Sequence, residues 1–130
     1  MKKQSELAEV ASNTITTQRI YGDPGVRSGK RILVDRLWPR GLTKAKADVD
    51  LWLKEIAPST GLRKSFHSGE LDWPEFRRRY VEEVRKNQGA FDQLVAEAEA
   101  GPIVLLYGSH ETEENHAIIL HELLRARLEE

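Results

Sequence analysis

The sequence predicts an α/β domain in which a small, mostly parallel sheet of three or four strands is flanked by helices. Two runs of consecutive apolar residues, within residues 31–35 and 103–107, indicate strands that are buried on both faces, as in parallel sheets. Long helical stretches lie between these runs, and parallel strands need such long connections. A third strand is predicted over residues 15–21, where apolar and polar residues alternate.

Helices are predicted where apolar residues recur at helical spacing behind a capping residue. The expected caps are Thr43, Ser59 or Thr60, Asp72 and Asn115. The helix after Thr43 is expected to end at residues 57–59, and residues 62–66 to form a short helical turn. The four expected apolar stripes are Val49, Trp52, Leu53 and Ile56; Phe76, Tyr80 and Val84; Phe91, Leu94, Val95 and Ala98; and Ala117, Leu120, Leu124 and Leu128.

The length of 130 residues predicts one domain with a single core. Residues 1–14 are expected to be an N-terminal extension, disordered or a frayed helix, and residues 15–130 to form the domain. Residues 1–5 are not followed by the apolar segment of a secretory signal, and no apolar run approaches the roughly 18 residues of a membrane span. We therefore expect a cytoplasmic protein without a membrane partner, whose oligomeric state the sequence leaves open.

The composition excludes several classes of function. Lys and Arg number 20 against 21 Asp and Glu, for a net charge of −1, so nucleic-acid binding would have to use a local basic patch. Bases outnumber acids between residues 27 and 46, and a second basic cluster occupies residues 77–79. The absence of cysteine excludes disulfides, thiolate nucleophiles and cysteine metal sites.

Two loops follow the two best strands, at residues 35–41 and 108–116. If the strands are parallel neighbours, both loops open at the sheet edge where open α/β sheets bind ligands. Arginine binds phosphate or carboxylate bidentately, tryptophan offers a stacking face, and the N-terminus of the last helix attracts anions. The sequence therefore predicts a site for a phosphate-bearing metabolite, a nucleotide or a nucleic-acid end. The predicted ligand-binding residues are Asp35, Arg36, Trp38, Arg40, Ser109 and Asn115, with His110 beside them.

Whether the site is catalytic stays open at this point. In an enzyme, Arg36 and Arg40 would hold phosphate while His116 or Glu111 moves a proton. In the alternative, a non-catalytic module uses the Arg-Leu-Trp-Pro-Arg loop of residues 36–40 to bind nucleic acid or protein. Structural explanations exist as well: the arginines could pair with Asp35 or with helix carboxylates such as those of residues 82 and 83, and Trp38 could be a packing lid.

No cofactor or metal is predicted. Positions 110, 116 and 121 lack the i, i+4 spacing that sets two imidazoles side by side on a helix, and His67 is remote from them in sequence. The chain has neither a Walker phosphate loop nor a Gly-x-Gly-x-x-Gly fingerprint. Ser109 lies outside any Gly-x-Ser-x-Gly elbow, so a serine hydrolase triad has no support.

Residues 34–41, Val-Asp-Arg-Leu-Trp-Pro-Arg-Gly, resemble the signature of the YeaO-like family, domain of unknown function 488. The resemblance implies a small α/β fold of bacterial and archaeal origin, and it brings no established catalytic set. It leads us to expect Lys or Arg followed by Asp where this chain has His110 and Glu111, and glutamine in some relatives at position 116. Some branches carry cysteines near this loop, where this chain has none. Similar segments continue at residues 52–59, 62–66, 76–80, 105–107 and 115–117, so that the resemblance spans about residues 15–128.

Overall fold

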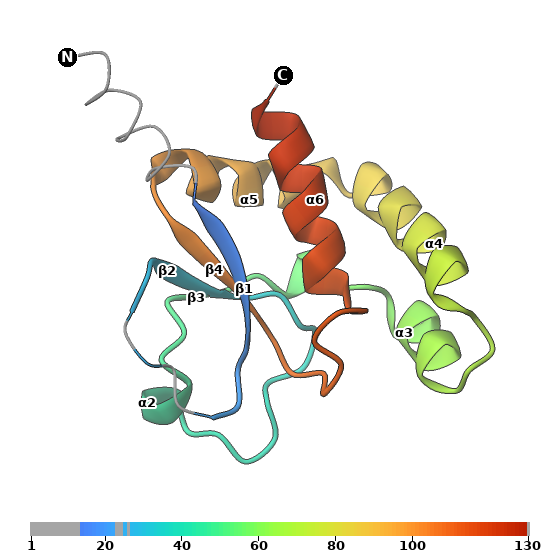
Figure 1. The fold of residues 1–130 in the computed structure, drawn as a ribbon, viewed down its shortest axis with the longest axis horizontal. Helices are drawn as coiled ribbons and strands as arrows, with labels where there is room; N and C mark the ends of the chain where they lie inside the picture. Colours follow the sequence, from blue (N-terminus) through green and yellow to red (C-terminus); the bar gives the residue numbers. More distant parts are fainter. Residues whose placement is uncertain (1–13, 23–24, 26, 130) are drawn as a thin grey trace.

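The computed structural model describes residues 14–22, 25 and 27–129, and these form a four-stranded parallel sheet in the order β1-β4-β2-β3. The predicted α/β class is confirmed. Residues 1–13 of the expected extension lie outside the described residues. The elements are β1 (Ile15–Arg19), β2 (Lys30–Leu33), α2 (Lys44–Ala47), β3 (Leu51–Trp52), the 3-10 helix η1 (Lys54–Ile56), α3 (Thr60–His67), α4 (Trp73–Lys86), α5 (Gln88–Ala100), β4 (Ile103–Tyr107) and α6 (His116–Leu128) (Figure 1).

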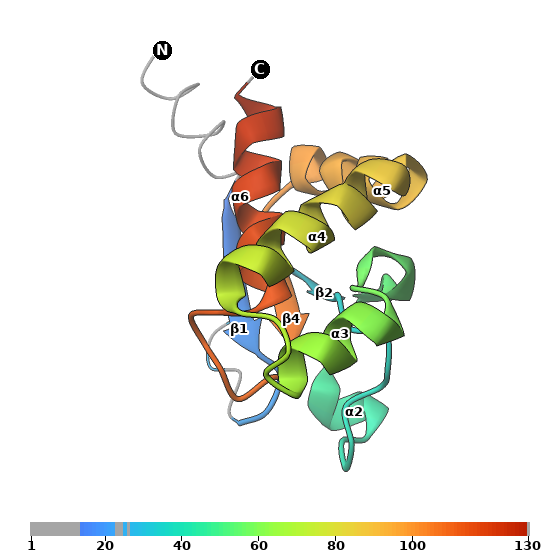
Figure 2. The same cartoon turned by 90° about the vertical axis from the view of Figure 1, so that its right-hand side faces the viewer.

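The central strand β4 is buried along its whole length, because a layer of structure covers each face of the sheet. Ile103 and Leu105 pack in the larger core, with residues of α3, α4, α5 and α6. Val104 and Leu106 point to the opposite face and pack in a smaller core with Ala47 of α2 and residues of the neighbouring loops. Figure 2 shows α2 well separated from α5 and α6. The continuous apolar run therefore reflects burial on both faces, as predicted.

Helices α3, α4 and α6 begin where the sequence predicts. The side chains of Ser59, Asp72 and Asn115 accept hydrogen bonds from the third residue of α3, α4 and α6, at 3.2, 2.9 and 3.1 Å. These bonds satisfy backbone N–H groups that a helix start leaves without an internal partner. Among the described helices, none combines the length and the apolar content that crossing a bilayer would need. The predicted stripes of α4, α5 and α6 are buried, except that Leu128 is half-buried.

The prediction of a single helix between Thr43 and residues 57–59 is wrong. Thr43 does cap a helix, but α2 ends after one turn at Asp48, whose left-handed backbone (φ 50°) terminates it. The chain then pairs with the edge of β2 as β3 and turns through η1. Val49 and Trp52 belong to the smaller core, whereas Leu53 and Ile56 belong to the larger one. The four residues have the spacing of one helical face, but in the structure they pack in two cores on opposite faces of the sheet.

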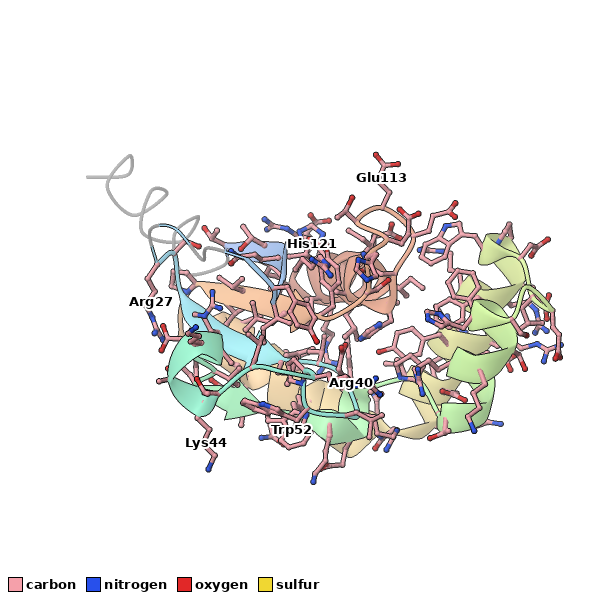
Figure 3. All side chains as sticks on the ribbon, turned by 90° about the horizontal axis from the view of Figure 1, so that it is seen from below. Arg27, Arg40, Lys44, Trp52, Glu113 and His121 are labelled. Carbon is pink, nitrogen blue, oxygen red and sulfur yellow. The ribbon has the colours of Figure 1, made fainter. Side chains whose placement is uncertain are left out.

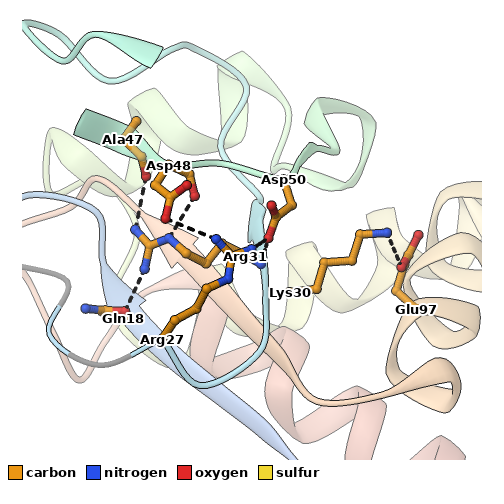
Figure 4. Close-up of polar contacts among 8 residues, drawn as sticks. All are labelled: Gln18, Arg27, Lys30, Arg31, Ala47, Asp48, Asp50 and Glu97. Atoms are coloured by element: carbon orange, nitrogen blue, oxygen red, sulfur yellow. Dashed lines mark hydrogen bonds and ion pairs between the residues drawn. The ribbon is translucent and has the colours of Figure 1, made fainter. Parts of the chain in front are cut away.

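Arg31 fixes this irregular segment to the sheet (Figure 4). It is 4% exposed, and its guanidinium donates to the carbonyls of Ala47 (3.1 Å) and Asp48 (2.8 Å) and to Gln18 Oε1 (3.2 Å). Its backbone N–H donates to Asp50 Oδ2 at 2.8 Å. Burial lowers the pKa of Arg31, and the charge of Asp48 opposes that shift. One buried cation therefore supplies hydrogen bonds to the two carbonyls at the end of α2.

Replacing Arg31 by Met is expected to lower the free energy of unfolding by about 1–3 kcal/mol, because two carbonyls lose their donor. Arg27→Met is the matched control, since its half-exposed guanidinium pairs with Asp48 and Asp50 from the surface and is expected to contribute less than about 1 kcal/mol. Urea unfolding measures both values, and amide hydrogen exchange should show faster exchange across residues 44–52 only in Arg31→Met. Equal losses in the two variants would contradict this assignment.

Candidate functional site

A cavity of about 490 Å³ opens where β2 and β4 end, between the loops that follow these strands and helices α3 and α4. Its volume lies within the roughly 300–1,000 Å³ that is typical of small-molecule sites. β2 and β4 are parallel neighbours, so the two predicted loops do meet at one edge of the sheet. The sequence-predicted residues that line the cavity are Asp35, Arg36, Ser109, His110, Glu111, Asn115 and His116.

Two predicted residues do not line the cavity. Trp38 packs in the smaller core, edge to face with Trp52 at 5.5 Å between ring centroids, and its Nε1 donates to the carbonyl of Leu42 at 2.8 Å. Arg40 is exposed and forms no ion pair with a carboxylate in the described part of the chain. Figure 3 shows Arg40 and Trp52 on the same side of the molecule. The loop after β2 is thus divided between the cavity and the smaller core.

Asp35 and His116 meet at the base of the cavity. Asp35 Oδ2 accepts the backbone N–H of Gly108 at 2.8 Å, which joins the ends of β2 and β4. His116 Nε2 lies 3.0 Å from both the Val34 carbonyl and Asp35 Oδ1. Because both neighbours are acceptors, Nε2 carries the hydrogen. The Val34 carbonyl is the hydrogen-bond acceptor, since Asp35 Oδ1 is buried without a well-aligned donor among the described residues.

Arg36 is partly used by the fold. It is half-buried, and it donates to the carbonyls of Ala57 (3.1 Å) and Pro58 (3.4 Å), which follow η1. Neither suggested helix carboxylate pairs with it, since Glu83 accepts two hydrogen bonds from Ser59 and residue 82 pairs with Arg78. Arg36 also borders a second cavity of about 100 Å³. It therefore brings a positive charge to the cavity while anchoring the chain after η1.

The loop between β4 and α6 forms the wall of the cavity that lies opposite helices α3 and α4. Ser109 Oγ accepts the backbone N–H of Glu111 at 3.1 Å, and Arg19 of β1 holds the Ser109 carbonyl (3.0 Å) and His110 Nδ1 (3.0 Å). Asn115 is buried: its amide donates to the Glu111 carbonyl at 2.8 Å, while its oxygen caps α6. Residue 113 points outward from this loop (Figure 3). The loop is held by its own hydrogen bonds and by β1.

Sequence reasoning missed the wall that α3 and α4 supply. Arg63, Phe66 and His67 of α3 line the cavity at i, i+3 and i+4, together with Phe76 of α4 and Glu114 of the opposite loop. The rings of Phe66 and Phe76 stack with centroids 4.3 Å apart. The helical spacing of the α3 residues is a signal in the sequence. It does not reveal which face of α3 meets the sheet edge, because that depends on tertiary packing.

Three histidines, His67, His110 and His116, line the same cavity. Even so, the residues that the structure describes contain no group of three or more His, Asp or Glu placed to hold a metal ion.

The basic cluster at residues 77–79 lies outside the cavity and is ion-paired. Arg77 pairs with Glu122 of α6, and Arg78 and Arg79 both pair with Glu75. Hydrogen bonds from Arg78 and then Arg79 lower the pKa of Glu75 to about 2. This cluster is a solvated helix face that stabilises α4 rather than part of the candidate site.

Tyr80 forms the buried support behind His116. Its hydroxyl donates to the Ile56 carbonyl at 2.6 Å, and its ring meets that of His116 edge to face at 6.0 Å. Burial raises the pKa of Tyr80 well above its usual value of 10, the charges of Glu83 and Asp35 raise it further, and Arg36 opposes them. The phenol therefore stays neutral and links η1 to the base of the cavity.

The chain is similar to known proteins over nearly its whole length. A family model described as "Inactive DUF488-N3 subclade" matches residues 14–130. "Uncharacterized protein YeaO" of Escherichia coli strain K12 is 44% identical over 113 residues, which cover 86% of this chain and 97% of that protein. The uncharacterized proteins Mb3100c of Mycobacterium bovis and Rv3073c of Mycobacterium tuberculosis are each 31% identical over 118 residues, 91% of this chain and 99% of theirs. No solved structure shows a significant match.

Tyr80→Phe is expected to lower the free energy of unfolding at pH 8 by about 1–3 kcal/mol, because the buried Ile56 carbonyl loses its donor. The folded-state pKa of Tyr80 is raised, so its stabilising effect is full below the unfolded-state value of about 10 and is lost as pH rises further. Urea unfolding at pH 8 and about 11 should therefore show a smaller alkaline loss in Tyr80→Phe than in the wild type. Equal losses of unfolding free energy between pH 8 and about 11 in the two proteins would contradict a buried, neutral Tyr80 hydroxyl.

Proposed function

The chain belongs to the YeaO-like DUF488 family, and we propose that its cavity binds a small molecule with an anionic group. The proposed class is a phosphate-bearing metabolite, a nucleotide or the end of a nucleic acid. The observation that carries the proposal is the convergence of two guanidinium groups, Arg36 from the loop after β2 and Arg63 from α3, on one cavity at the carboxyl edge of the sheet. This edge is where open α/β sheets bind their ligands.

Arg63 is the more available of the two arginines. It is exposed and has no carboxylate partner among the described ion pairs, so its planar set of N–H donors is free for a phosphate or carboxylate. Arg36 contributes its charge from deeper in the cavity, although part of its donor set is occupied by carbonyls. The N-terminus of α6, at His116, opens beside the same cavity and adds a positive dipole end.

Binding without turnover is favoured over catalysis. The proton-bearing Nε2 of His116 is directed at Val34, and Glu111 Oε1 accepts the backbone N–H of Glu113 at 3.0 Å. His116 Nε2 is therefore engaged with the backbone that follows β2, and one oxygen of Glu111 with the backbone of its own loop. The description of the matching family model as an inactive subclade agrees with this proposal.

A second candidate function is docking of nucleic acid or protein on the loop of residues 36–40. Leu37 favours it, since this side chain is 66% exposed at the mouth of the cavity, and Arg40 is exposed nearby. Trp38 would not take part by stacking, because its ring packs in the smaller core. A partner on this loop would therefore contact Leu37 and Arg40.

The test is a two-dimensional amide NMR titration of the full chain with inorganic phosphate, nucleoside monophosphates and short single-stranded DNA and RNA. We expect shifts at Arg36, Arg63 and residues 108–116 together. Arg63→Gln should weaken the tightest-binding probe about tenfold or more, because a charge-assisted hydrogen bond is worth roughly 1.5–3 kcal/mol.

Lys64→Gln is the matched control, because Lys64 is the exposed neighbour of Arg63 on α3 and does not line the cavity. It should bind like the wild type. Equal weakening by both substitutions would indicate a general charge effect and contradict the proposal. Shifts confined to residues 36–40 on addition of DNA or RNA would favour the docking loop instead.

A further inference from the structure

The two walls of the cavity differ in chemistry. On one side, Arg63, Phe66 and His67 of α3 present a cation, an aromatic ring and an imidazole from a single helix face. Phe66 is half-buried and stacks on the buried ring of Phe76, so a second aromatic ring supports this wall. Trp73 packs within 5.9 Å of both rings and extends that support.

The opposite wall and the base are acidic. Glu111 and Glu114 line the cavity from the loop before α6, and Asp35 lies at its base. These three carboxylates outnumber the two guanidinium groups of Arg36 and Arg63 in the lining. A ligand with more than one phosphate group would bring additional negative charge close to the carboxylates, which is unfavourable. The lining fits one anionic group together with hydrogen-bond donors.

We propose that the ligand is a ribonucleoside 5′-monophosphate, with its phosphate at Arg63, its base on Phe66 and its ribose hydroxyls at Glu111 and Glu114. This inference rests on the proposed function and specifies its ligand. Carboxylates accept hydrogen bonds from ribose hydroxyls in other α/β nucleotide sites. Glu111 Oε1 is already oriented by the backbone N–H of Glu113, which leaves its second oxygen for such a hydroxyl.

The aromatic wall explains why a base is included in the proposal. Base–aromatic stacking is tolerant of base identity because every base has a π-face. The cavity volume of about 490 Å³ is within the range of sites for a molecule of this size. A free phosphate would bind at Arg63 but would make no contact with Phe66 or with the carboxylates of Glu111 and Glu114.

Isothermal titration calorimetry on the full chain tests the inference with the four ribonucleoside 5′-monophosphates, their 2′,3′-dideoxy forms, ribose 5-phosphate and inorganic phosphate. At least one monophosphate should bind at least tenfold more tightly than its dideoxy form and than ribose 5-phosphate. The corresponding triphosphate should bind more weakly than the monophosphate, because its added charges meet the acidic wall.

Two variants locate the contacts. Phe66→Leu should reduce the affinity for the monophosphate to that for ribose 5-phosphate, with far-ultraviolet circular dichroism confirming the fold. Glu111→Gln, at an exposed position, should reduce the preference for ribose over dideoxyribose several-fold. Glu113→Gln is its control, since Glu113 points outward from the same loop and is expected to keep that preference (Figure 3).

The outcomes separate this inference from the proposed function. Equal affinities for phosphate, ribose 5-phosphate and the monophosphates, all weakened by Arg63→Gln, would overturn the inference and leave an anion site. Equal affinities for ribose and dideoxyribose forms would also overturn it. Absence of binding by every probe would overturn both the inference and the proposed function.

Discussion

The parallel pairing of β2 with β4 is the constraint on which the candidate site depends. Residues 30–33 pair with residues 103–106, so the two strands end together at one edge. Asp35 and Gly108 follow those ends and are joined by a hydrogen bond of 2.8 Å. An antiparallel arrangement would send the two loops to opposite edges and separate this pair. The two loops that line the cavity meet because the strands before them share this edge.

The loop after β2 connects the candidate site to the smaller core on the other face of the sheet. The loop that follows β2 supplies Asp35 and Arg36 to the cavity and also Trp38 to the layer on the other face. Trp52 Nε1 donates to the backbone carbonyl of Asp35 at 2.7 Å, while the Asp35 side chain binds Gly108. Asp35 is therefore held by the smaller core through its carbonyl and by the end of β4 through its side chain.

The features that could be predicted from the sequence are those with a local cause. Continuous apolar runs, capping side chains and helical stripes identify the parallel sheet, α3 to α6 and the meeting of the two loops. The path of residues 43–56 does not follow from local patterns, because its apolar residues divide between two cores and Arg31 holds the irregular segment through hydrogen bonds. The wall formed by Arg63 and Phe66 cannot be predicted from the sequence, because only tertiary packing decides which face of α3 meets the sheet edge.

The most specific sequence motif, residues 34–41, serves mainly to fold its own loop. Trp38 donates a hydrogen bond to a nearby carbonyl, and Arg36 donates one to the backbone after η1. Asp35 accepts one from the backbone N–H that follows β4. Arg63 and Glu111, the exposed residues that we propose contact the ligand, lie outside the motif. Exposed side chains with few internal contacts change at little cost in stability. Substitution of Arg63 or Glu111 would therefore change the lining of the cavity and leave the hydrogen bonds that fold the loop of residues 34–41 in place.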